Sequence, residues 1–67
     1  MNIGERIKKE REQLGWSQEA LAFSAGVSQR CISHYELGQR EPQYETIKKI
    51  MKALGFQVQL VKMEGEK

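Results

Sequence analysis

The stretch from Gln18 to Gly38 constrains the fold of this 67-residue chain more than any other. It contains two short helical patterns, over 18–25 and 28–36, which are separated by a single turn. Gly26 lacks a Cβ and tolerates positive φ, so it favours a sharp turn at this point. Ser28 is a suitable N-cap for the second helix, because its side chain can accept a bond from the free N–H groups of the first turn. The stretch therefore predicts two helices joined by a tight turn.

Apolar side chains fall on one face of each of these helical patterns. Leu21, Ala22 and Ala25 share a face of the first helix. Ile32 and Tyr35 point inward from the second. Because Ala22 is small, the two helices can cross closely. This is the arrangement of a helix-turn-helix, whose second helix enters the major groove of DNA.

The rest of the chain predicts one helix on each side of this pair and a strand at the end. The flanking helical patterns cover 3–14 and 44–54. Apolar and polar residues alternate over 56–61, and a period of two predicts a strand. Residues 62–67 form a polar tail. We expect an all-α fold with four helices over residues 1–55, followed by one short C-terminal β-strand.

Residues around the first loop predict how the first two helices begin and end. Ile3, Ile7 and Leu14 lie near one face of the first helix, which we expect to be buried. Ser17 is a good N-cap for the second helix. Trp16 precedes this cap at the spacing of a hydrophobic staple, so we expect it to pack on the core.

Composition limits the classes of function that the chain can have. Its net charge of +2 permits nucleic-acid binding without arguing for it. The single Cys31 cannot form an internal disulfide, and we interpret it as a packing residue in a reducing cytoplasm. There is no apolar run of about 18 residues and no pattern of a secretory signal, so no membrane partner is expected. The chain has no Asp, no phosphate-binding glycine loop and only one His. We therefore predict no enzyme, no cofactor and no metal site.

The residues around the two central helices resemble the phage-repressor-like (Cro/C1-type, XRE) helix-turn-helix family. Seven positions of the motif fit the family pattern: Leu21, Ala22, Ala25, Gly26, Val27, Ile32 and Tyr35. Flanking positions fit as well: Ile7, Arg11, 15–18, Gly38, Pro42, Thr46, Ile47 and 53–55. The resemblance covers residues 3–55 and implies sequence-specific binding of double-stranded DNA.

The resemblance also implies which side chains contact the bases. These are the outward residues of the second motif helix: Gln29, Arg30, Ser33 and His34. Their chemistry is suitable, because Gln can bond adenine and Arg can bond guanine through two hydrogen bonds. The alternative is that they are ordinary solvent-exposed residues of a surface helix.

Other residues are expected to hold the domain on the DNA or to hold the domain together. Gln18, Ser28 and Arg40 are the candidates for phosphate contacts, which set register rather than sequence preference. Similar proteins pair an Arg at the position of Arg11 with a Glu at the position of Glu36. The resemblance therefore implies a structural ion pair between these two side chains.

The final strand predicts a homodimer, because a lone strand leaves unpaired N–H and C=O groups at its edges. Phe56, Val58 and Leu60 share one face of this strand and are the predicted dimer interface residues. The function that we expect is a dimeric transcriptional repressor on a palindromic operator. The alternative is an antitoxin: a strand after 53–55 resembles the HipB-like antitoxins, which repress their own operon and bind a kinase-like toxin protein.

Overall fold

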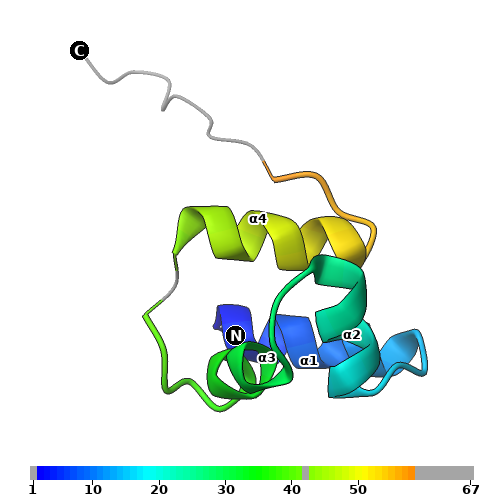
Figure 1. Ribbon diagram of the computed structural model, residues 1–67, viewed down its shortest axis with the longest axis horizontal. Coiled ribbons are helices and arrows are strands. Elements are labelled where there is room, and N and C mark those ends of the chain that lie inside the picture. Colours follow the sequence, from blue (N-terminus) through cyan, green and yellow to red (C-terminus); the bar gives the residue numbers. More distant parts are fainter. Residues whose placement is uncertain (1, 42, 59–67) are drawn as a thin grey trace.

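The computed structural model describes residues 2–41 and 43–58. These residues contain the four expected helices: α1 (Ile3–Gln13), α2 (Gln18–Ala25), α3 (Gln29–Glu36) and α4 (Tyr44–Ala53). Helix α2 contacts both α3 and α4, and α3 also packs on α1. Figure 1 shows α4 along the top of the molecule and α3 at the bottom, so the two helices lie on opposite sides of it. The all-α, four-helix class predicted from the sequence is confirmed.

The N-termini of three helices are closed by side chains. Asn2, Ser17 and Ser28 each accept a hydrogen bond from the backbone N–H three residues further on, at 2.8, 3.0 and 3.1 Å. Such caps satisfy donors that have no partner within the helix. The two serine caps predicted from the sequence are therefore confirmed. Gln43, at the start of α4, makes no side-chain cap bond.

The turn between α2 and α3 depends on a left-handed residue. Gly26 has φ 75° and ψ 30°, a conformation that costs little only where there is no Cβ. Its N–H and that of Val27 both donate to the carbonyl of Ala22, at 2.9 and 3.0 Å. These bonds close the end of α2 and direct the chain into α3.

A single apolar core joins the four helices. Its fully buried large side chains come from α1, α2, α3 and α4: Ile7, Leu21, Ile32, Tyr35 and Ile50. Trp16 packs against this core, as predicted. The prediction for Leu14 is wrong, because its side chain is 49% exposed. Helix α1 ends at Gln13 with Leu14 as its C-cap, and Trp16 packs on the core after the following turn.

Helices α1 and α3 approach each other at a glycine. A Cβ added to Gly4 would overlap the carbonyl oxygen of Tyr35 on α3. Only a residue without a side chain allows the two backbones to come this close. The position of α3 relative to α1 therefore depends on Gly4.

The segment after α4 packs on the helices. Phe56 and Val58 are half-buried against the core, and the guanidinium of Arg6 lies 5.3 Å from the centre of the Phe56 ring. Residues 56–58 are not in a strand in this single chain, and Leu60 with the rest of 59–67 lies outside the described residues. The strand pairing stays a prediction, and so does the antitoxin role, which rests on the resemblance of this segment to the HipB-like antitoxins. Among the described residues, none of the helices has the length and apolar character needed to span a membrane.

Candidate nucleic-acid interface

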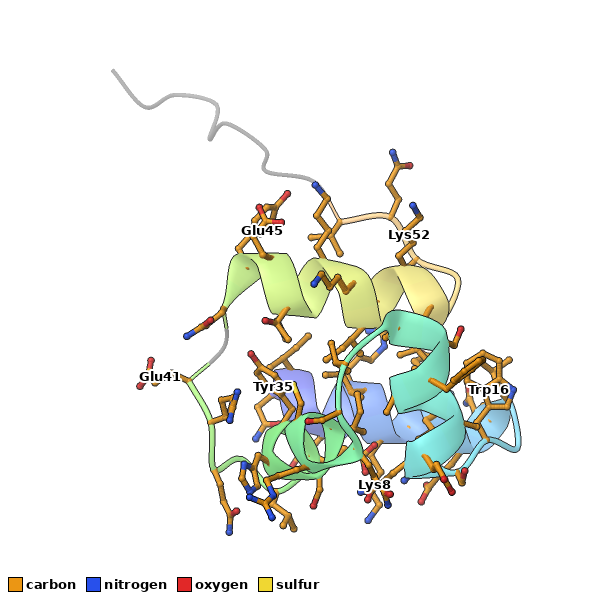
Figure 2. The ribbon with its side chains drawn as sticks, in the orientation of Figure 1. Lys8, Trp16, Tyr35, Glu41, Glu45 and Lys52 are labelled. Carbon is orange, nitrogen blue, oxygen red and sulfur yellow. The ribbon has the colours of Figure 1, made fainter. Side chains whose placement is uncertain are left out.

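Helix α3 has one buried face and one face open to solvent. Cys31, Ile32 and Tyr35 are buried in the core. In Figure 2 the Tyr35 side chain lies between α3 and α4, where its hydroxyl accepts a bond of 3.3 Å from the N–H of Gln43. The opposite face carries four polar residues: Gln29 and Arg30, which are exposed, and Ser33 and His34, which are partly exposed. The four predicted base-contacting residues therefore share one accessible face.

An ion pair connects the C-terminal end of α3 to α1. Arg11 donates from Nε to one carboxylate oxygen of Glu36 at 2.7 Å and from Nη2 to the other at 3.0 Å. The Arg11 side chain is 11% exposed and that of Glu36 only 3%. This two-bond geometry fixes both the distance and the angle between the groups. The structure thus contains the ion pair implied by the family resemblance.

Arg11 has further contacts that keep its guanidinium in place. Its Nη1 donates to the backbone carbonyl of Trp16 at 2.7 Å, next to the start of α2. The hydrogen bond to Glu36 is the main cause that raises the pKa of Arg11 above its usual value, against the opposing effect of burial. An Arg guanidinium stays charged at any ordinary pH, so the ion pair is not lost through deprotonation of Arg11. Arg11 therefore links α1, the α2 entry and α3.

Gln18 joins the same network. Its amide Nε2 donates to a Glu36 oxygen at 3.0 Å, and the residue is partly buried at the first position of α2. An amide nitrogen carries two protons, so the second remains free to donate to a phosphate oxygen. The bond to Glu36 holds the Gln18 amide in one orientation, and the phosphate contact of Gln18 stays a prediction.

The other two residues predicted to contact phosphate flank α3 in the sequence, with Ser28 as its N-cap and Arg40 in the loop that follows it. The Ser28 oxygen accepts the cap bond at the start of α3, which leaves its hydroxyl proton available. Arg40 is exposed in the loop after α3. Lys52 of α4 lies elsewhere: Figure 2 shows it on the outer side of α4, away from α3. In the part of the chain that the structure describes, no group of three metal-ligating side chains comes together.

Sequence reasoning missed two contacts that position α3. The carbonyl of Trp16 and the backbone oxygen of Tyr35 beside Gly4 are main-chain atoms, which every residue type carries. No pattern of side chains could have indicated them. The bond from Gln18 to Glu36 was also missed, since the sequence predicts a phosphate contact for this side chain and a side-chain amide has no sequence signature for an internal partner.

Comparison with known proteins gives several matches. A family profile described as helix-turn-helix matches residues 7–61. The chain is 38% identical over 53 residues to an SPbeta prophage-derived uncharacterized HTH-type transcriptional regulator, YonR of Bacillus subtilis strain 168, which covers 79% of this chain and 49% of that protein. An uncharacterized HTH-type transcriptional regulator of Haemophilus influenzae is 43% identical over 51 residues, or 76% of this chain and 52% of its own length.

A further relative is the HTH-type transcriptional regulator ImmR of Bacillus subtilis, which is 30% identical over 50 residues, 75% of this chain and 39% of its own. The chain thus spans about half of the length of the curated relatives that it matches, or less. No solved structure matches the chain.

Proposed function

Because the chain belongs to the XRE-type helix-turn-helix family of DNA-binding transcriptional regulators, we propose that it is a repressor that binds a palindromic operator as a homodimer. The observation that carries this proposal is the division of α3 into a buried face and an accessible polar face. The ion pair between Arg11 and Glu36 holds this helix against α1, so its outer face is presented in one orientation.

The outer face of α3 has the chemistry that reads bases. Arg30 can donate two bonds to the O6 and N7 atoms of guanine, and Gln29 can bond the N6 and N7 atoms of adenine. Both side chains are exposed at the N-terminal end of α3, the end that helix-turn-helix proteins direct to base edges. We assign sequence preference mainly to these two residues. Ser33 and His34, beside them on the same face, are the further base-contacting candidates.

The phosphate contacts come from residues around this face. Gln18 and Ser28 supply neutral donors and Arg40 supplies a positive charge. Neutral donors fix the register of the domain, whereas a cation releases counterions from the DNA and makes affinity depend on salt.

The homodimer would form through residues 56–61. Phe56 and Val58 turn toward their own helices and are half-buried, while Gln57 is exposed. This placement supports a strand whose apolar face covers the core and whose edge is free to pair with the same segment of a second copy. A two-fold dimer would place its two α3 helices in half-sites about 34 Å apart, which is one turn of DNA.

The experiment is selection of bound duplexes from a random DNA pool, followed by fluorescence anisotropy with the selected duplex and a scrambled one. We expect a palindromic consensus and an affinity that falls as salt rises from about 50 to 200 mM. Arg40→Ala should weaken binding to both duplexes and reduce the slope of log K against log salt by about one per protomer. Lys52→Ala removes the same charge from the outer side of α4. It should change neither the affinity nor the slope of log K against log salt. Equal affinity for both duplexes would contradict the proposal.

The dimer is tested separately by a chain that stops after Val58, which keeps the packing of Phe56 and Val58 on the helices. Light scattering should give the mass of a monomer, with the helical circular dichroism spectrum unchanged. Operator affinity should fall strongly because each protomer then binds one half-site alone. If the truncated chain remains a dimer, the dimer interface lies on the helices and this part of the proposal is wrong.

A further inference from the structure

Leu37 is an exposed apolar residue on the same stripe of α3 as the candidate base-contacting residues. Its side chain is 66% exposed. It follows Glu36 as the C-cap of α3 and keeps helical backbone angles, φ −84° and ψ −4°. At about 100° per residue, a position seven residues after Arg30 lies only about 20° away from it around the helix axis. Ser33 and His34 lie on either side of the line that joins these two residues.

The backbone holds Leu37 firmly in this position. Its N–H donates to the carbonyl of Ser33 at 3.0 Å. The next two N–H groups, of Gly38 and Gln39, turn back to the carbonyls of Tyr35 and His34 at 3.1 and 2.8 Å. The end of α3 is therefore closed by hydrogen bonds, and the side chain of Leu37 projects from a fixed point.

A single exposed leucine is ordinary on a protein surface, so exposure alone does not indicate a binding role. Leu37 is distinguished by its position on the α3 stripe. Seven residues of α-helix extend about 10 Å along the axis, and the major groove is about 12 Å wide. If Arg30 reaches base edges within the groove, Leu37 lies two turns further along the same stripe, near the groove wall. Thymine C5-methyl groups and deoxyribose rings are the apolar groups that DNA offers there.

We infer that Leu37 makes an apolar contact with the operator DNA, to a thymine methyl group or to a deoxyribose at the edge of the major groove. This inference rests on the proposed function, since it needs α3 to enter that groove. Leu37 has no hydrogen-bonding group in its side chain, so its contribution comes from the removal of apolar surface from water.

The test uses the duplex selected by the unchanged 67-residue chain, with fluorescence anisotropy as the measurement. Leu37→Ala should lower the affinity about tenfold. Phe23→Ala is the matched control, because Phe23 is 90% exposed on α2 and is not on the α3 stripe. It should bind the duplex like the unchanged protein. Arg30→Ala should also lose affinity, and if it does not, the proposed use of the α3 face fails before Leu37 is considered.

A second set of duplexes distinguishes the two sources of the contact. Each thymine is replaced in turn by deoxyuridine, which removes only the C5-methyl group. Loss of one buried methyl should lower affinity about fourfold at one position of each half-site. For Leu37→Ala the same replacement should then have no effect. If Leu37→Ala lowers the affinity but no deoxyuridine replacement lowers the affinity of the unchanged protein, the contact is to deoxyribose.

Two results would overturn the inference. One is that Leu37→Ala binds the selected duplex normally while Arg30→Ala does not. The other is that light scattering shows a smaller mass for Leu37→Ala than for the unchanged protein. In that case Leu37 would belong to a contact between protein chains, and its effect on affinity would come from loss of the dimer.

Discussion

Helices α3 and α4 both turn an apolar face to the same core, but different contacts hold them there. At its start α3 is capped by Ser28, and at its end Glu36 is bonded to Arg11. Helix α4 has no side-chain cap at Gln43, and within the described residues it makes no ion pair with another helix. Its buried side chains, such as Ile50, supply most of its attachment. Directional polar contacts are thus concentrated on the helix whose orientation would matter for reading DNA.

The largest difference should appear when the ion pair of α3 is broken. Arg11→Ala or Glu36→Ala leaves a buried charge without a partner, which should lower the free energy of unfolding by about 3–5 kcal/mol. Lys49→Ala on α4 removes an exposed charge and should change it by less than about 0.5 kcal/mol. Urea unfolding followed by circular dichroism measures all three. Similar midpoints for the three variants would mean that the pair contributes no more than a surface contact.

The close approach of α1 and α3 should give the next largest effect. Gly4→Ala places a methyl group against the carbonyl of Tyr35, and overpacking of this kind costs about 1–3 kcal/mol. In an open helix the same change would stabilise by about 1 kcal/mol, because Ala is the better helix former. Lys9→Ala, on the exposed side of α1, is the control. The sign of the change in Tm shows whether α1 and α3 are in tight contact at this position. A Gly4→Ala protein with a higher Tm would exclude the contact.

The helix caps should give a smaller effect, and it should differ between α3, which has a cap bond, and α4, which has none. Ser28→Ala removes the bond to the first turn of α3 and should lower the free energy of unfolding by about 1 kcal/mol. Gln43→Ala removes a side chain that makes no cap bond and should have little effect on α4. Thermal unfolding of the two variants under one set of conditions compares them directly. If Gln43→Ala lowers the stability as much as Ser28→Ala does, the N-termini of α3 and α4 do not differ in side-chain capping.

The sequence predicted the elements of this fold well, because each depends on local features. The helix faces follow from apolar spacing, the starts from Ser17 and Ser28, and the central turn from Gly26. Leu14 shows where local reasoning fails. Periodicity places it on the buried stripe of α1, but Leu14 is the C-cap of this helix and is 49% exposed, because how far the core extends along a helix depends on the tertiary packing and not on the spacing of its residues.

The candidate site was less predictable than the fold. The ion pair between Arg11 and Glu36 joins residues far apart in the chain, and only resemblance to a family suggested it. The role of Gly4 depends on a backbone atom of α3, which has no sequence signature. The outer face of α3 could be located, since its residues are those that the buried pattern leaves out. Its specificity depends on a DNA partner, which the chain alone does not define.

We propose that the outer face of α3 reads bases while residues around it hold phosphates. The most direct test measures the affinity of Arg30→Ala and Arg40→Ala for a set of duplexes in which every base pair of the selected operator is changed in turn. We predict that Arg30→Ala loses its preference at one position of each half-site, at a cost of about 1–3 kcal/mol, and keeps the others. Arg40→Ala should bind every duplex more weakly by the same factor. A uniform loss for both variants would contradict the assignment of base reading to this face.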